Sequence, residues 1–375
     1  MTEETIPEPD RVEGAPHPRD TARLIGQDAA ETGFLEAYAA GRLHHAWLLT
    51  GPLGVGKATL AWRIARFLLT TPDDAGGGLF DGVPTAPATL DIDPTHPVAR
   101  RLHAGSEGRL FVLRRAWDDE KRRLKTVITV DEVRRLASFL HLSAPDGGRR
   151  AVIVDPADEM NTAAANALLK MLEEPPPGVT FLLVGHQPSR LLPTIRSRCR
   201  ELRLSALSPA DLTAAIAAAG VAAEGGDGLA VLAGGSVGEA IRLANLDGLQ
   251  TYGSIVTLFS TLPRLDRPAA LRLAESVARN GSAERLDLLL SLMELFLARL
   301  ARTGATGRLD PEAVPGEAAR LARLAPDAIA GRRWAGLQQS LGARARHGQA
   351  VNLDPAALVL DLVLKIDEAA REGAW

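Results

Sequence analysis

Short apolar runs alternate with amphipathic stretches along the first half of the chain. Runs rich in residues that favour β-strands lie at 45–51, 110–115, 151–155 and 180–185. Between them, apolar residues recur at helical spacing over 58–69, over 130–142, and from 161 to the three prolines at 175–177. Strands that alternate with helices are typical of a parallel sheet whose connections are crossover helices. We therefore predict an α/β fold for residues 21–205.

The second half of the chain is predicted to be helical. Residues 206–250 are rich in alanine with helical spacing, and a second helical region covers 251–375 with a break near 304–316.

Two earlier segments lack any regular period. Residues 1–20 are acidic and rich in proline, so we expect a disordered tail. Residues 72–97 are rich in Gly, Pro, Asp and Thr and are predicted to form a long loop.

The composition of the chain restricts its domain number, its cysteine chemistry, its contacts with nucleic acid and its location. A length of 375 residues exceeds one usual hydrophobic core and favours two or three domains. The net charge is −3, so any contact with nucleic acid has to be local. Cys199 is the single cysteine, which excludes an internal disulfide and a cysteine zinc cluster and suits a reducing cytoplasm. No apolar stretch reaches the length of a membrane span, and the N-terminus lacks the pattern of a signal peptide, so we expect a cytoplasmic protein.

A glycine loop stands between the first predicted strand and its helix. The sequence GPLGVGK at 51–57 fits the G-x-x-x-x-G-K pattern, in which backbone N–H groups surround a phosphate and the lysine reaches the terminal phosphates. A glycine loop retained only for packing a strand against a helix would have the same sequence. The candidate nucleotide-binding residues are Gly51, Gly54, Gly56, Lys57, Thr59 and Asp155.

Two positions that an ATPase needs are altered. Ala58 replaces the Ser or Thr whose hydroxyl holds Mg²⁺, and Thr59 is rotated by about 100° around the helix from that place. Asp155 ends the third strand as a Mg²⁺-holding acid would, but Pro156 follows it where a glutamate would activate water. ATP binding is therefore doubtful, and Mg²⁺ is expected only together with ATP.

Further charged residues lie close to the third and fourth predicted strands. We interpret Asp158 and Glu159 as acids at the start of the next helix, stabilised by its dipole. Arg196 and Arg198 follow the fourth strand in TIRSRCREL, and from the residues alone they form only a basic helix end. The basic cluster at 114–125 is interrupted by acids, which favours a solvated surface over a DNA groove.

Three longer stretches carry a more specific signal. They are HHAWLLTGPLGVGKATLAWRIARFLL at 44–69, NALLKMLEEPPPGVTFLLVGHQPSRLLPTIRSRCREL at 166–202, and NLDPAALVLDLVLKID at 352–367. Together they resemble the AAA+ clamp-loader subunits of bacterial DNA polymerase III, and among these the delta-prime subunits. In that family the arginine of the Ser-Arg-Cys triplet acts on ATP bound by the adjacent motor subunit. The resemblance therefore implies that Arg198 is a catalytic arginine finger that acts in trans.

The resemblance also implies an architecture and a set of partners. Residues 21–205 would form an AAA+ core, 206–250 a small helical lid, and 251–375 a helical collar for oligomerisation. The chain would assemble with the gamma/tau motor subunits and the delta subunit, and the complex would load the β sliding clamp onto primed DNA. Family members often hold zinc with four cysteines after the first helix. Residues 70–97 contain no cysteine, so no zinc is expected.

The departures from the family pattern agree with one another. Besides Ala58 and Pro156, the stretch GGSVGEAI puts Gly238 or Glu239 where a lid arginine is expected, and His186 is the candidate for a polar sensor. We therefore predict a subunit that completes a neighbour's site and whose own ATPase activity is lost. Two alternatives remain open from the sequence. One is an ATP-hydrolysing gamma/tau-like motor or another AAA+ ATPase, and the other is a P-loop nucleotide kinase.

Overall fold

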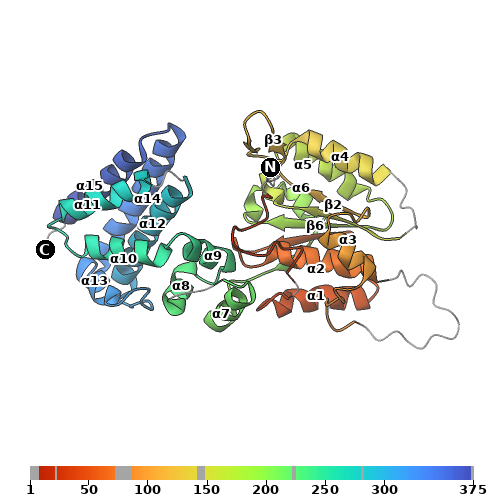
Figure 1. The fold of residues 1–375 in the computed structure, drawn as a ribbon, viewed down its shortest axis with the longest axis horizontal. Helices are drawn as coiled ribbons and strands as arrows, with labels where there is room; N and C mark the ends of the chain where they lie inside the picture. Colours follow the sequence, from red (N-terminus) through yellow and green to blue (C-terminus); the bar gives the residue numbers. More distant parts are fainter. Residues whose placement is uncertain are drawn as a thin grey trace, which may run out of the picture. The chain divides into compact units, whose positions relative to one another are not determined.

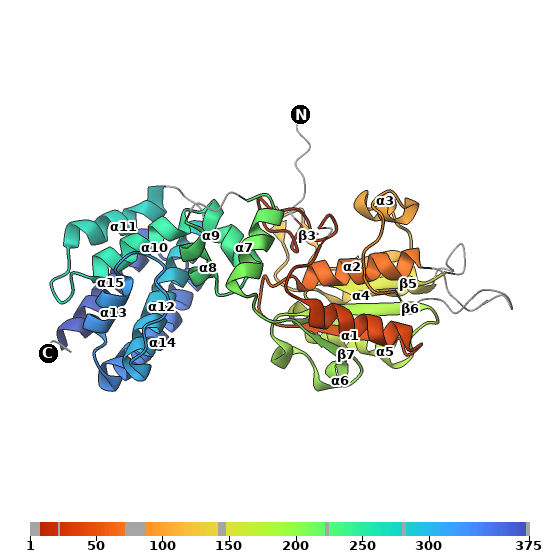
Figure 2. The same cartoon turned by 90° about the horizontal axis from the view of Figure 1, so that it is seen from below.

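The computed structural model describes residues 8–21, 23–71, 87–141, 148–221, 225–279 and 283–372. The chain forms two compact units. The first comprises Met1–Val221 with Gly235–Glu239, and the second comprises Ala222–Gly234 with Ala240–Trp375. Figure 1 and Figure 2 show that the first unit contains the sheet and that the second is built from helices. The stretch predicted as a lid is therefore divided between the two units.

A five-stranded parallel sheet forms the centre of the first unit. Its strands are β1 (Ala46–Thr50), β2 (Leu110–Leu113), β5 (Arg150–Val154), β6 (Val179–Gly185) and β7 (Arg200–Arg203). They are arranged in the order β2-β5-β6-β1-β7, and every pairing is parallel. β1 and β6 are buried along their whole length because helices cover both faces of the sheet. The predicted α/β fold with a parallel sheet is confirmed.

Seven helices accompany this sheet in the first unit as far as the structure describes it. They are α1 (Asp28–Ala39), α2 (Lys57–Thr70), α3 (Pro97–His103), α4 (Val130–His141), α5 (Thr162–Glu173), α6 (Pro193–Arg196) and α7 (Pro209–Ala218). Short helical turns occur at η1 (Ala157–Glu159) and η2 (Pro188–Arg190). Figure 1 shows α1 and α2 on one face of the sheet and α4 and α5 on the other. The α4 and α5 side holds an apolar core that includes Leu136, Leu168 and Phe181.

Three short strands were not expected from the sequence. β7 is an edge strand in which only Leu202 is buried, so its polar composition hides the strand pattern. Its Arg200 guanidinium lies over the Trp47 ring, 5.1 Å from the centroid. β3 (Trp117–Asp118) and β4 (Arg123–Leu124) pair as an antiparallel hairpin inside the basic cluster.

Residues 8–21 make defined contacts within the first unit, whereas residues 1–7 of the tail predicted to be disordered lie outside the described residues. The His17 side chain is 3% exposed, and its ring meets the edge of the Trp62 ring with the centroids 5.6 Å apart. Arg66 donates a hydrogen bond to the carbonyl oxygen of Arg19. The partners of this segment come from positions far along the chain, so composition alone did not reveal them.

The second unit is all helical where it is described, as the sequence predicts. Its helices are α8 (Gly226–Ala233), most of α9 (Val237–Asn245), α10 (Gly248–Phe259), α11 (Arg267–Arg279), α12 (Ala283–Thr306), α13 (Glu317–Leu324), α14 (Ala328–Ala350) and α15 (Pro355–Glu372). A buried polar centre joins three of these helices. The Glu317 carboxylate accepts hydrogen bonds from Tyr252 Oη at 2.6 Å and from Arg299 Nε at 2.7 Å. This carboxylate is thus fully paired inside an otherwise apolar core.

Candidate functional site

The carboxyl ends of three neighbouring strands bring predicted site residues together. β1 leads into the glycine loop at 51–57, β5 leads into Asp155, and β6 leads to His186. In a parallel α/β sheet these ends form the edge at which ligands usually bind. The charge of Asp155 acts on the pKa of Lys57, and the charge of Lys57 acts on the pKa of His186. These three side chains therefore form one electrostatic cluster.

The glycine loop has a backbone that requires glycine at three positions, and at Gly51, where φ is 140°, an added Cβ would lie 2.3 Å from the carbonyl oxygen of Leu204. Gly54 and Gly56 have φ angles of 74° and 100°. A Cβ atom on Gly54 would lie 2.3 Å from Ser236 Oγ, and the N–H of Gly238 donates to the Gly54 carbonyl at 3.1 Å. A Cβ atom on Gly56 would lie 2.5 Å from Leu24 Cδ1. The loop is thus in direct contact with the start of α9 and with the chain before α1.

Lys57 is turned toward its own loop. Its Nζ donates hydrogen bonds to the carbonyl oxygen of Gly51, at 2.7 Å, and to that of Pro52. The side chain is buried, and this burial lowers the pKa of its ammonium group to about 8. The charges of Asp155 and Asp158 partly oppose the lowering. The ammonium group therefore stabilises the loop carbonyls in this arrangement.

Asp155 is buried at the end of β5. Burial, together with the charge of the nearby Asp10 carboxylate, raises the pKa of its carboxyl group to about 7. Its backbone N–H donates to the Leu113 carbonyl at 3.0 Å, which continues the pairing between β5 and β2. Pro156 follows it and has no side chain that could accept a proton from water. The site thus has the acid of an ATPase without its catalytic base.

Asp158 connects the turn after β5 to the end of β6. Its carboxylate accepts the backbone N–H groups of His186 at 3.2 Å and of Gln187 at 2.7 Å. Burial, together with the charge of Lys57, lowers the pKa of the His186 imidazole to about 4. His186 is therefore neutral at physiological pH. Because both oxygens of Asp158 hold backbone groups, this residue shapes the site.

The two acids after Pro156 do not begin a helix, which corrects the prediction for Asp158 and Glu159. Both lie in the turn η1, and α5 begins only at Thr162 with Asn161 as its cap, whose side chain accepts the N–H of Ala164. Glu159 is instead paired with Arg115, with 3.0 Å between Oε2 and Nε. Ion pairing and backbone capping, rather than a helix dipole, stabilise these carboxylates.

The arrangement described above does not fit ATP with Mg²⁺. The ammonium group of Lys57 is bonded to its own loop, and the loop carbonyl of Gly54 is bonded to Gly238. Ala58 and Thr59 both lie in the first turn of α2, and Ala58 supplies no hydroxyl for a metal. A second carboxylate, that of Asp10, lies close enough to act on Asp155. A nucleotide would have to displace these contacts.

Arg198 lies between α6 and β7, and its contacts differ from those of the nucleotide-site residues. The guanidinium is paired with Glu173 at the end of α5, with 2.8 Å between Nη2 and Oε1, and its Nη1 donates to the Thr194 carbonyl at 3.0 Å. The side chain is 36% exposed. The adjacent Cys199 packs against the sheet core, and burial raises the pKa of its thiol to about 12. Arg198 is thus an accessible cation, whereas Cys199 is a structural residue.

Glu173 belongs to the site of Arg198, although the sequence analysis did not single it out. It stands in the LEEPPP stretch, which was used only as a family signal. The distance of 25 positions between the two residues hides the pairing, because it depends on how α5 and α6 pack against each other.

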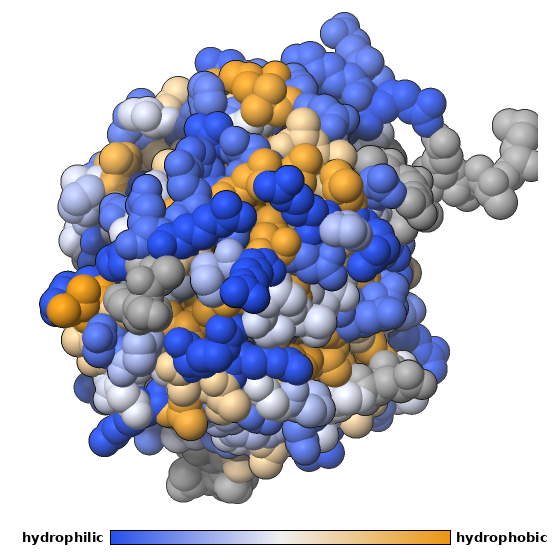
Figure 3. All heavy atoms as spheres, turned by 90° about the vertical axis from the view of Figure 1, so that its left-hand side faces the viewer, coloured by the Kyte–Doolittle hydropathy of each residue, from blue (hydrophilic) through white to orange (hydrophobic). Residues whose placement is uncertain are grey.

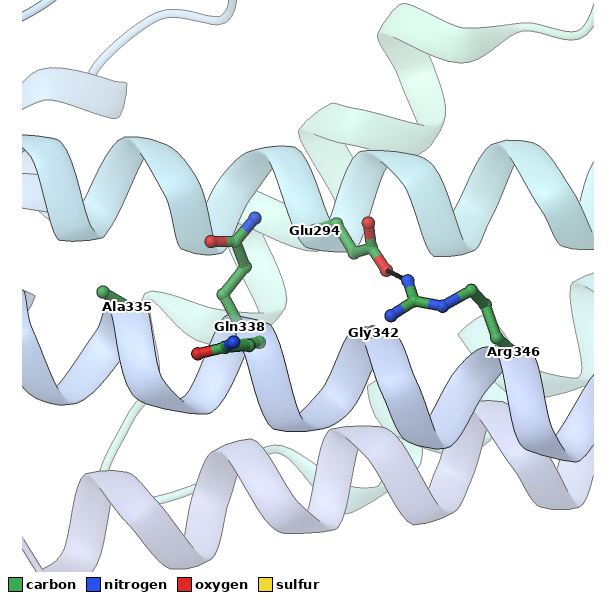
Figure 4. Close-up of a pocket in the computed structure, with 6 residues that line it drawn as sticks. Glu294, Ala335, Gln338, Gly342 and Arg346 are labelled. Carbon is green, nitrogen blue, oxygen red and sulfur yellow. Dashed lines mark ion pairs between the residues drawn. The ribbon is translucent and has the colours of Figure 1, made fainter. Parts of the chain in front are cut away.

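Other parts of the described structure provide fewer groups that could bind a metal or catalyse a reaction. Among the described residues, no group of three or more His, Cys, Asp or Glu side chains could hold a metal ion. The loop for which zinc was judged absent falls mostly outside these residues. A hollow of about 330 Å³ lies between α12 and α14 in the helical unit, and its lining includes Glu294 and Arg346, which pair at 3.9 Å. Figure 4 shows the residues that line it. Its lining is polar, and we assign it no catalytic role.

The strand order, the glycine loop after β1 and the acid after β5 define a P-loop domain of the AAA+ class. Comparison with known proteins shows which members of this class the chain resembles. A family model described as "DNA polymerase III, delta subunit" matches residues 26–208. Over these residues the chain is therefore similar to that family, and several of its curated relatives are named delta' subunits. Every helix in the described part of the chain is too short or too polar to cross a membrane.

Three relatives illustrate the match. The DNA polymerase III subunit delta' of Pseudomonas aeruginosa is 42% identical over 155 residues, which is 41% of each chain. The delta' subunit of Escherichia coli is 36% identical over 166 residues, or 44% of this chain and 43% of the relative. The gamma/tau subunit of Mycobacterium tuberculosis is 30% identical over 53% of this chain and 31% of its own length. The chain thus matches less than half the length of these relatives.

Proposed function

We propose that this protein is the delta-prime subunit of a bacterial DNA polymerase III clamp loader and donates Arg198 to the ATP site of a neighbouring subunit. The observation that carries the proposal is the contrast between two cations. Arg198 is accessible on a short helix end, whereas Lys57 of the chain's own P-loop is buried and bonded to that loop. An arginine that reaches a neighbour's phosphates stabilises the transition state of phosphoryl transfer.

We extend the proposal to the partners that the family resemblance implies. With gamma/tau and delta subunits as partners, the complex would load the β sliding clamp onto primed DNA, in the cytoplasm. The helical unit suits assembly with other subunits. Figure 3 shows apolar side chains among charged ones on one end of it, and Leu271 of α11 and Leu364 of α15 are 49% and 45% exposed. Exposed leucines of this kind are compatible with helix-to-helix contacts.

The motor alternative is not favoured. Hydrolysis needs a metal-binding hydroxyl after Lys57 and a base after Asp155, and this chain has Ala58 and Pro156. Asp158 does not replace the base, because its carboxylate is held by two backbone N–H groups. The kinase alternative gives no role to the exposed Arg198.

ATP turnover by the reconstituted loader on primed DNA tests the proposal. Arg198→Ala should lower turnover at the neighbouring site by about 10³-fold, since the cation acts in the transition state. Arg196→Ala is the matched control, because Arg196 is an exposed arginine two positions earlier, and it should have little effect. Lys57→Ala should also leave turnover nearly unchanged.

The opposite pattern would contradict the proposal. If Lys57→Ala abolishes turnover while Arg198→Ala leaves it intact, the chain is a working motor. The loss in Arg198→Ala should appear in kcat, with KM for ATP changed little, because the finger acts on bound nucleotide.

A further inference from the structure

The segment at residues 8–21 is held by charged residues at the carboxyl end of the sheet. Arg114, directly after β2, pairs with Asp10 at 2.9 Å and with Glu8 at 3.0 Å. His17 Nε2 lies 3.2 Å from Asp10 and 3.3 Å from Glu8, so two cationic or donor groups share the two carboxylates. The Asp10 side chain is 1% exposed. A carboxylate so buried is stable only with such partners.

The same segment also contacts residues that lie next to the glycine loop of the nucleotide site. Val12 lies within 3.7 Å of the place where a Cβ on Gly238 would be, and Gly238 in turn contacts Gly54 of the glycine loop. Further along, His17 packs on Trp62 of α2, the helix that begins with Lys57. Figure 1 and Figure 2 both draw the segment in dark red beside α2. The segment therefore lies close to Gly238, which contacts the glycine loop, and packs on α2, the helix that follows this loop.

The charge of the segment opposes a nucleotide. Asp10 is near enough to Asp155 to raise the pKa of that carboxyl group. Phosphates brought to this edge would meet the carboxylate of Asp10 beside Asp155, while Arg114 is already paired with Asp10 and Glu8. Like charges at short range in a buried setting are strongly unfavourable.

We propose that residues 8–21 act as an intramolecular strap that closes the chain's own P-loop site against nucleotide. The strap, latched by Glu8 and Asp10 on Arg114, supplies the contacts that order this edge of the sheet. A subunit closed in this way keeps one shape whether or not ATP is present. The proposal concerns the chain's own site, so it stands or falls independently of the role of Arg198.

Binding of a fluorescent ATP analogue with Mg²⁺ to the full-length chain and its variants tests the strap. The wild type should show no saturable binding at millimolar analogue. Truncation of residues 1–16 should strengthen binding at least about tenfold. Adding Lys57→Ala to the truncated chain should abolish the gained binding, which shows that the analogue occupies the P-loop. If the folded truncated chain binds no better than wild type, the strap does not exclude nucleotide and the proposal fails.

A point variant keeps the test valid if the truncation impairs folding. Arg114→Ala removes the latch and leaves the strap in place, and Arg134→Ala is the matched control because Arg134 is an exposed arginine of α4 paired only locally with Asp131. Trypsin should cleave after Arg11 at least about tenfold faster in Arg114→Ala than in wild type, since cleavage follows the open population. Analogue binding should increase in the same variant. Equal cleavage and equal binding in Arg114→Ala and Arg134→Ala would overturn the proposal.

Discussion

Single residues set the character of the site at the end of the sheet. Lys57 and Asp155 have their usual P-loop positions, yet both are buried and both have shifted pKa values. The lysine bonds its own loop, and the aspartate is followed by Pro156. Arg198 keeps an accessible guanidinium with Glu173 as its partner. At this scale the chain retains the framework of an ATP site whose lysine is engaged by its own loop, while Arg198 has a partly exposed guanidinium.

Asp155 should make the free energy of unfolding depend on pH. Its pKa is raised from 3.8 to about 7 by burial, so the folded chain binds the proton more tightly than the unfolded chain. The stability gained from protonation is complete below pH 3.8 and is lost as the pH rises through about 7. Asp155→Asn does not titrate, so its stability relative to wild type should increase between pH 4 and 7 by an amount on the order of a few kcal/mol.

Urea unfolding followed by tryptophan fluorescence across this pH range measures the effect. Asp131→Asn is the control, because Asp131 is 70% exposed on α4. A pH dependence of Asp155→Asn that matches the wild type would show that the pKa of Asp155 is the same in the folded and unfolded chains.

Contacts between elements determine the conformation of the glycine loop. The loop follows β1 and leads into α2, but its middle is positioned by the start of α9 through Ser236 and Gly238. On the other side of the same sheet edge, η1 is connected to β6 through Asp158. The loop is therefore held by elements that lie far from it in sequence.

Gly54→Ala should destabilise the first unit more than Gly41→Ala does. Both glycines have positive φ angles, 74° and 64°, so both substitutions pay for a left-handed backbone. Only at Gly54 would the new Cβ meet another atom, Ser236 Oγ at 2.3 Å, whereas Gly41 has nothing within 4 Å. We expect an additional loss of about 1–3 kcal/mol for Gly54→Ala. Chemical unfolding followed by circular dichroism measures the free energy of unfolding of both variants. Equal losses would mean that the residues at the start of α9 do not restrict a side chain at position 54.

At the scale of the whole molecule, each unit has its own means of stabilisation. The first unit is organised by the parallel sheet, and the second by long helices around the buried Glu317 carboxylate. Glu317 is 0% exposed and also accepts the N–H of Ala313 at 2.8 Å. Loss of this carboxylate would leave the Arg299 charge buried without its partner, which is costly.

Glu317→Ala should therefore destabilise the helical unit by about 3–5 kcal/mol. Glu368→Ala is the control from the same unit, since its side chain is 59% exposed and its pair with the exposed Lys365 should contribute little. Amide hydrogen exchange resolved by peptide measures both units at once. Exchange should accelerate in α12 and α13 and stay unchanged in β1 and β5. Equal acceleration in the sheet would indicate that the two units unfold together.

The sequence by itself determined the elements that depend on local pattern. The strands β1, β2, β5 and β6 are apolar and the helices that follow them have regular apolar periods, so they were predictable. The glycine loop, Ala58 and Pro156 can likewise be identified directly in the sequence. The role of Arg198 remains a prediction from the family resemblance. β7 was missed because an edge strand buries only one of its side chains.

Only the tertiary structure decided which distant residues meet. The pairing of Asp10 with Arg114 spans 104 positions, and that of Tyr252 with Glu317 spans 65. Apolar periodicity reports which face of an element is buried, and it carries no information about the partner on the other side. Ion pairs and hydrogen bonds need particular atoms within about 3 Å, a condition that is met only when the packing of the elements brings those atoms together. The strap, the partner of Arg198 and the centre of the helical unit all depend on that packing.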